Sequence, residues 1–178
     1  ELLDTAISQE RKQDIKGAQF FYDKAIKTYP QSWKAHKMYG KFCAQRLNKK
    51  AEAISLYRKA SLYAPSEGKE RSQLFREWGV LLQDSGDPHA TTQAMEKFEE
   101  ALVEAPNDFQ IILLLVQMFL KQGMYLKVIE KAGYLENHKS KSIRTEILPI
   151  LLNCYEKTHN ILKKAEIIQK IENLKKES

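Results

Sequence analysis

The clearest chemistry in this sequence is a cluster of positive charge between Ser32 and Gly68. That segment holds eight basic residues against two acidic ones, so its net charge of +6 equals the net charge of all 178 residues. Lys34, Lys37 and Lys41 follow one another at i, i+3 and i+7, which places them along one helical face. A row of ammonium groups attracts carboxylates and phosphates. The pattern predicts an anion-facing surface, and the competing interpretation is a solvated helix face.

Histidine and cysteine are too scattered to indicate catalysis or metal binding. No pair of them has metal-ligand spacing, and the turn expected at 84–88 lacks the Gly-Lys-Ser/Thr of a phosphate-binding loop. We interpret the histidines as solvated or packed groups, Cys43 as a buried structural thiol and Cys154 as a partly exposed one. We therefore expect no enzyme, no cofactor and no metal site. The histidines are His36, His89, His138 and His159.

An internal repeat predicts the elements that must position the lysines. Three segments share the spacing Ala-x3-aromatic-x2-Ala-x4-Pro, and an aromatic residue followed by glycine precedes two of them. On a helix, the alanines and the ring share one face, so a neighbouring helix can approach closely, and the proline ends the helix. Glycine is unfavourable inside a helix, so the two glycines at matching positions predict close contact between helices. The segments begin at Ala18, Ala53 and Ala94, with rings at Tyr22, Tyr57 and Phe98, and the aromatic–glycine pairs are Tyr39-Gly40 and Trp78-Gly79.

These residues resemble the tetratricopeptide repeat, whose pattern is W-x2-L-G-x2-Y, then A-x3-F, then P over about 34 residues. Two weaker copies follow, so the resemblance covers essentially the whole chain. Departures from the repeat period lie in turns, with about one extra residue near 47–48, about four at 66–71 and about three within 84–92. It implies an all-α, right-handed superhelical solenoid of about five antiparallel helix pairs in a single domain, 1–178. The repeats are expected at about 1–31, 32–68, 69–106, 107–140 and 141–178. The helices are expected at about 2–13, 15–29, 32–46, 50–63, 69–84, 89–105, 107–122, 125–137, 142–158 and 160–176.

In this family the first helix of each repeat lines a concave groove that holds the partner. Registration on Gly40 implies a groove that is basic in repeat two, mixed in repeat three and polar to apolar in repeat four. The implied groove residues are Lys34, Lys37, Lys41, Gln73, Arg76, Gln110, Leu113 and Gln117. The two-carboxylate clamp of chaperone-binding members is absent, because Leu3 and Ile7 stand where its lysine and asparagine are required.

Two features of the last repeat carry their own expectations. Pro149 allows a helix that starts near Leu148 or a longer helix that is kinked at the proline, and we favour the kink. The last helix carries an apolar stripe that we expect to pack inward, which would leave a polar outer face to cap the stack. The stripe consists of Ile161, Ala165, Ile168, Ile171 and Leu174.

Composition excludes several other classes of protein. Glycine and proline number 7 and 5, too few for the many turns of an all-β fold. The longest apolar run, 111–116, is six residues, against the roughly 20 needed to span a bilayer. Two cysteines provide no disulfide framework, so we expect a reducing, cytoplasmic location. Because Glu1 opens directly into a helical pattern, we interpret the chain as a fragment of a larger protein.

The sequence thus predicts a non-enzymatic protein–protein interaction scaffold whose concave, partly basic groove binds a peptide segment of a partner. Expected partners are proteins or peptides, acidic ones among them, and other domains of the parent protein. A membrane is not expected, and nucleic acid is disfavoured because the lysine stripe lacks interleaved arginines and exposed aromatic rings. Two alternatives stay open: a structural or regulatory arm of a larger signalling protein, such as one behind a nucleotide-driven switch, and an RNA-binding repeat module.

Overall fold

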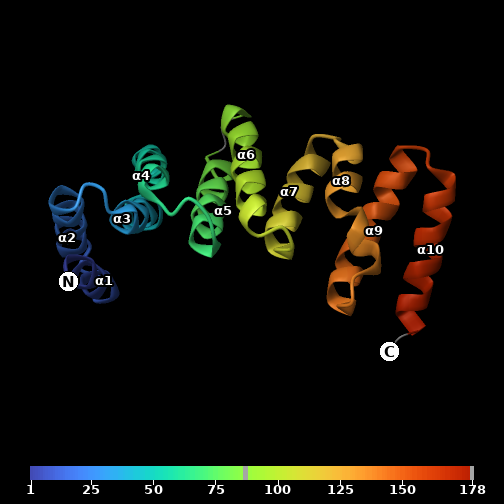
Figure 1. The fold of residues 1–178 in the computed structure, drawn as a ribbon, viewed down its shortest axis with the longest axis horizontal. Coiled ribbons are helices and arrows are strands. Elements are labelled where there is room, and N and C mark those ends of the chain that lie inside the picture. Colours follow the sequence, from blue (N-terminus) through green and yellow to red (C-terminus); the bar gives the residue numbers. More distant parts are fainter. Residues whose placement is uncertain (86–87, 177–178) are drawn as a thin grey trace. The chain divides into compact units, whose positions relative to one another are not determined.

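The computed structural model describes residues 1–85 and 88–176, and within these residues the secondary structure is entirely helical (Figure 1). The all-α expectation is therefore confirmed. The helices are α1 (Leu2–Arg11), α2 (Ile15–Thr28), α3 (Trp33–Gln45), α4 (Lys50–Tyr63), α5 (Lys69–Gln83), α6 (Pro88–Glu104), α7 (Phe109–Lys121), α8 (Tyr125–Ala132), the 3-10 helix η1 (Gly133–Asn137), α9 (Lys141–Lys157) and α10 (Ile161–Lys176).

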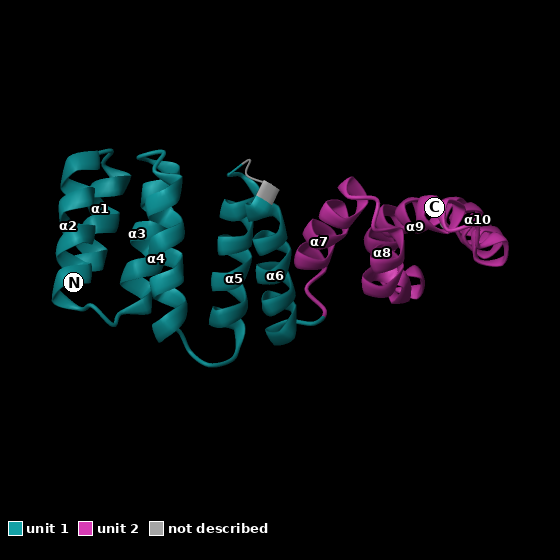
Figure 2. Ribbon diagram, turned by 90° about the horizontal axis from the view of Figure 1, so that it is seen from above, with its two compact units in different colours: residues 1–106 teal, residues 107–178 magenta. Residues whose placement is uncertain are grey.

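The helices form two compact units (Figure 2). The first, Glu1–Pro106, contains α1 to α6, and the second, Asn107–Ser178, contains α7 to α10. In both units, consecutive helices pair as the repeats predict: α1 with α2, α3 with α4, α5 with α6, α7 with α8 and α9 with α10. The second helix of a pair then packs on the first helix of the next, as α2 does on α3, α4 on α5 and α8 on α9.

The repeat residues form the contacts inside each pair. The three rings of the motif are buried, and so are its alanines. A Cβ atom built on Gly40 would lie 3.1 Å from the Tyr57 ring, and one on Gly79 would lie 2.7 Å from the Phe98 ring. Both glycines therefore let the ring of the second helix lie directly against the backbone of the first, as the sequence predicts.

The turns between the two helices of a repeat share one backbone conformation. Gln13, Asn48, Gly123 and His159 have φ of 61°, 53°, 69° and 54°, and each lies two residues before a second helix begins. After α1, α7 and α9, a backbone N–H donates a hydrogen bond to the carbonyl oxygen five residues earlier, which is the Schellman motif. After α3 the corresponding bond runs from Lys49 N–H to the Cys43 carbonyl, six residues back. This turn therefore contains the one extra residue expected near 47–48, whereas the turn of repeat three falls partly on 86–87, outside the described residues.

Helix α9 starts at Lys141 and runs through Pro149, as the favoured interpretation requires, which excludes the alternative start near Leu148. Two other expectations about the C-terminal half are wrong. The segment expected to be helical to 137 ends as an α-helix at Ala132 and continues as η1. Cys154 is fully buried rather than partly exposed.

The last helix packs only in part by the predicted apolar stripe. Of that stripe, Leu174 is buried and Ile171 is half-buried, whereas Ile161, Ala165 and Ile168 are exposed. Ile167, which lies outside the stripe, is buried instead. Lys163 and Lys170 lie on the same side as Ile167, where both pair with the nearly buried carboxylate of Glu136.

Candidate partner-binding groove

The three lysines of the predicted stripe occupy three different environments on α3. Lys34 is exposed, with its Nζ 3.4 Å from a Glu70 carboxylate oxygen. Lys37 is only 15% exposed, and its Nζ lies 3.3 Å from Glu77 Oε1. Lys41 is exposed and has no ion pair among the described residues. Two of the three lysines are thus exposed to solvent, and α5 provides carboxylates for the first two members of the row.

Glu77 is the centre of a small polar network between α3, α4 and α5. Besides Lys37, its carboxylate accepts hydrogen bonds from Gln73 Nε2 at 2.9 Å and from the Tyr57 hydroxyl at 3.2 Å. Burial, together with this carboxylate, raises the pKa of Tyr57 far above its usual value, so the phenol remains a donor. Lys37 and Gln73, both predicted groove residues, are thus joined through an acid that the sequence analysis had not assigned to this surface.

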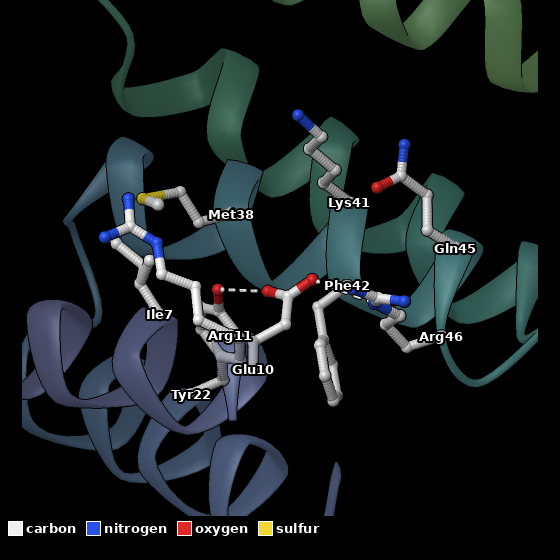
Figure 3. Close-up of a pocket in the computed structure, with 9 residues that line it drawn as sticks. All are labelled: Ile7, Glu10, Arg11, Tyr22, Met38, Lys41, Phe42, Gln45 and Arg46. Carbon is white, nitrogen blue, oxygen red and sulfur yellow. Dashed lines mark hydrogen bonds and ion pairs between the residues drawn. The ribbon is translucent and has the colours of Figure 1, made fainter. Parts of the chain in front are cut away.

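A pocket of about 280 Å³ lies between the first helices of repeats one and two (Figure 3). Ile7, Met38 and Phe42 give it apolar walls, while Arg11 and Lys41 bring positive charge to it. Lys41 and Gln45 project to the same side in the close-up. Of the predicted groove residues, only Lys41 lines this pocket.

Glu10 fixes one side of the pocket. Its Oε2 accepts a hydrogen bond from the Tyr22 hydroxyl at 3.1 Å, and its Oε1 lies 3.2 Å from Arg46 Nε (Figure 3). Burial, and next the Glu10 charge, raises the pKa of Tyr22 far above its usual value. Arg46 therefore pairs with this carboxylate, whereas Arg11 and Lys41 have no ion pair among the described residues.

The remaining predicted residues lie on α5 and α7. Arg76 is half-buried on α5 and has no ion pair among the described residues. On α7, Gln110 and Gln117 are exposed and Leu113 is half-buried, so these three share an accessible face. They belong to the second compact unit, so they form a separate part of the candidate surface.

Several pocket residues were missed by the sequence reasoning. Registration on glycine assigned groove positions only from repeat two onward, so Arg11 and Glu10 of repeat one were not considered. Met38 lies between Lys37 and Tyr39, and a pattern of charges gives no signal for an uncharged side chain. Ile7 stood at a clamp position of repeat one but served only to exclude the clamp, so it was not assigned to the groove.

His36 and Cys43 are buried, as their interpretation as packed groups requires, and Cys154 is buried as well. His36 is buried, with Nε2 2.8 Å from the Pro30 carbonyl oxygen, which is a packing contact. Burial raises the pKa of the Cys43 thiol to about 12 and that of Cys154 to about 11, so both stay protonated. No group of three His, Cys, Asp or Glu side chains suited to a metal ion occurs among residues 1–85 and 88–176. Over the same residues, no helix is both long and apolar enough to cross a membrane.

Comparison with solved structures shows the fold of this chain. The TPR protein YrrB, described as having an unusual peptide-binding site, is 16% identical with a TM-score of 0.71, over 97% of this chain and 84% of YrrB. The MamA protein is 16% identical with a TM-score of 0.70, over 98% of this chain and 90% of MamA. A chain in the structure of Naa15/Naa10 bound to HypK-THB is 17% identical with a TM-score of 0.70, over 97% of this chain and 25% of that chain.

No protein-family model matches the chain, and no curated protein matches it by sequence. The structural likeness nevertheless extends over nearly the whole chain. The protein is an all-α helical solenoid with the tetratricopeptide-repeat fold. This class is defined by the helix pairs, by the glycine–ring contacts and by these structural likenesses.

Proposed function

We propose that this protein is a non-enzymatic scaffold that binds a peptide segment of a partner protein on the first helices of its repeats. The observation that carries the proposal is the pocket between α1 and α3, which combines apolar walls with unneutralised cations. Apolar walls favour binding of an apolar side chain, and positive rims select acidic neighbours and speed association. YrrB, which has a peptide-binding site, and the Naa15/Naa10 complex bound to HypK-THB are consistent with this use of the fold.

The ligand that fits these residues is a peptide with an apolar anchor flanked by carboxylates. The anchor would lie against Ile7, Met38 and Phe42, and the carboxylates would pair with Arg11 and Lys41. Arg76 would extend the positive surface along α5. Lys34 and Lys37 would contribute less charge, because Glu70 and Glu77 already neutralise much of it, and the Gln73 amide already donates a hydrogen bond to Glu77.

The test is a titration of the protein into a fluorescein-labelled peptide with one leucine between glutamates, followed by anisotropy. We expect binding that weakens with salt, since the Debye length falls from about 10 Å at 0.1 M to about 3 Å at 1 M. Lys41→Glu/Arg76→Glu should weaken binding strongly. The matched control is Arg58→Glu/Lys59→Glu, which changes the charge equally at two exposed residues of α4.

The control pair also separates the alternatives. If both double variants weaken peptide binding equally, the attraction is a diffuse effect of basic charge. A titration with single-stranded RNA in place of the peptide would then test the RNA-binding alternative. If neither double variant weakens peptide binding, the proposal is contradicted, and the alternative function as a structural or regulatory arm is favoured. Leu113→Glu, on the accessible face of α7, tests whether the second unit takes part in binding.

A further inference from the structure

A second pocket, of about 430 Å³, lies between the second helices of repeats one and two, inside the first compact unit (Figure 2). We call it the α2–α4 pocket. It shares no lining residue with the pocket between α1 and α3. Its volume falls within the range of about 300–1,000 Å³ that is usual for small-ligand sites. The lining residues come from α2, α3 and α4 and are Lys16, Gln19, Phe20, Asp23, Tyr39 and Glu52.

Phe20 brings an exposed aromatic ring to this pocket. The residue is 62% exposed, although its ring is held in an edge-to-face contact with Phe21, at 5.3 Å between centroids. Two residues after the first alanine of the motif, where α2 has Phe20, α4 has Ser55 and α6 has Glu96. The ring is therefore no part of the packing that the repeats share. An aromatic ring that is held in place beside a pocket is a surface on which a flat group can stack.

The charged groups at the pocket are two paired carboxylates and two unpaired lysines. Asp23 and Glu52 each lie close to a lysine of the same repeat, at 2.6 Å and 3.2 Å. Their charge is largely neutralised, but their oxygens can still accept hydrogen bonds. Lys16 is exposed and has no ion pair among the described residues. The same is true of Lys59, which is seven residues after Glu52 and so on the same side of α4, about 10 Å along the helix.

We infer that the α2–α4 pocket binds an unstacked base of a single-stranded nucleic acid. The base stacks on Phe20 and donates hydrogen bonds from its edge to Asp23 and Glu52, while Lys16 and Lys59 pair with phosphates of the strand. A stacking ring, hydrogen bonds to the base edge and cations along the backbone are the contacts by which proteins recognise single strands. The lysine row of α3 lacks such a ring, whereas this pocket has one.

The carboxylates also indicate which base fits best. Guanine presents an N1–H and an N2–H₂ group side by side, and these two donors suit one carboxylate. Uracil presents a single N3–H between two carbonyl oxygens, which an ionised carboxylate cannot satisfy because it only accepts hydrogen bonds. We therefore expect guanine to bind more tightly than uracil.

Other anionic partners fit this pocket less well. The side chains of an acidic peptide would meet Asp23 and Glu52, which are acceptors like themselves. A bilayer surface is flat and would extend from α4 to the neighbouring second helix α6. There the positions equivalent to Phe20 and Lys59 hold Glu96 and Glu100, whose charge repels anionic lipids.

The test compares two fluorescein-labelled RNA heptamers, one of uridine alone and one with guanosine at its centre. Both carry the same backbone charge, so a difference in anisotropy titrations reports on the base. We expect the guanosine heptamer to bind at least about fivefold more tightly. Phe20→Leu, which keeps an apolar side chain without the ring, should weaken this binding at least about fivefold. The control Tyr29→Leu, at an aromatic residue that is 59% exposed outside the pocket, should change it by less than about twofold.

Two double variants with the same change of charge test the phosphate contacts. Lys16→Glu/Lys59→Glu should weaken binding of the guanosine heptamer at least about tenfold and make it less dependent on salt, because two phosphate contacts are lost. The groove variant Lys41→Glu/Arg76→Glu should change it by less than about twofold. The result is then independent of the proposed peptide site.

Three results would overturn the inference. Equal binding of the two heptamers would exclude recognition of the base, and equal effects of Phe20→Leu and Tyr29→Leu would exclude stacking in the pocket. Equal losses from the two double variants would show a diffuse attraction of basic charge. Guanosine monophosphate that binds as tightly as the heptamer would assign the pocket to a free nucleotide and contradict its assignment to a strand.

Discussion

The close contact between Gly79 and Phe98 allows a quantitative prediction for the substitution Gly79→Ala. The new Cβ atom would lie 2.7, 2.9 and 3.0 Å from three atoms of the Phe98 ring. That ring is 0% exposed, so it cannot move into solvent. At Gly40 the new Cβ atom would lie 3.1 and 3.2 Å from the Tyr57 ring and 3.3 Å from the Ala53 carbonyl oxygen, so these neighbours would have to move by only a few tenths of an ångström.

Two opposing effects determine the free energy of unfolding. Alanine is favoured over glycine inside a helix by about 1 kcal/mol, and this gain applies at both positions. Overpacking a tight core costs about 1–3 kcal/mol, and we expect that cost at Gly79 alone. Gly40→Ala should therefore be neutral or stabilising, and Gly79→Ala should be less stable than Gly40→Ala by about 1–3 kcal/mol. Gly79→Leu should be worse still.

The measurement is urea unfolding followed by tryptophan emission, because Trp33 and Trp78 both lie in the first unit and report on it alone. The cause is isolated by adding Phe98→Leu, which removes the ring that clashes. The Gly79→Ala/Phe98→Leu variant should be more stable than the sum of the single effects implies, by about 1 kcal/mol. If Gly79→Ala equals or exceeds Gly40→Ala in stability, or if the two changes are additive, the packing argument is refuted.

Three further predictions concern single groups. Lys37→Glu should lower the free energy of unfolding by about 1–3 kcal/mol, because it sets two carboxylates together in a largely buried site. Lys41→Glu, at an exposed residue, should lower it by less than about 0.5 kcal/mol. Equal effects of the two substitutions in urea unfolding would contradict this prediction. Gly123→Ala should lower stability by about 1 kcal/mol, since φ is 69° there, and an unchanged thermal midpoint would show that the turn relaxes. The pKa values of Cys43 and Cys154 are raised from 9.0 to about 12 and about 11, so only the unfolded chain loses these protons just above pH 9. Stability should therefore fall as pH rises from 9 towards 11, and a flat profile in urea unfolding would contradict the burial of the thiols.

The spacing of small and aromatic residues was sufficient to predict the helix pairs. Gly40 and Gly79 were expected to mark close helix contacts, and the distances to Tyr57 and Phe98 confirm that reading. This works because a contact inside one repeat depends on residues close together in sequence. The extra residue near Asn48 was also found from spacing alone, since the repeat period counts it directly.

The packing of α10 and the charge state of the lysine row could not be predicted in the same way. Ile161 and Ile167 are both apolar, and only the ion pairs of Lys163 and Lys170 with Glu136 show which face turns inward. Likewise, the neutralisation of Lys37 depends on Glu77, 40 residues further along the chain. Composition gives the charges but not the partner that each one meets in the next repeat. The assignment of the groove to a partner stays a prediction.

The recurring left-handed turn shows that the repeats share a conformation and not a residue. Glutamine, asparagine, glycine and histidine all occupy it, although only glycine does so without strain. A search that compares residue identities is blind to such a position, even though it sets where each second helix begins. Glycine at positions 13, 48 and 159 should therefore raise the free energy of unfolding, because it would keep the turns and remove the backbone strain. A redesigned consensus for this solenoid should therefore start from backbone angles at these turns and choose residues afterwards.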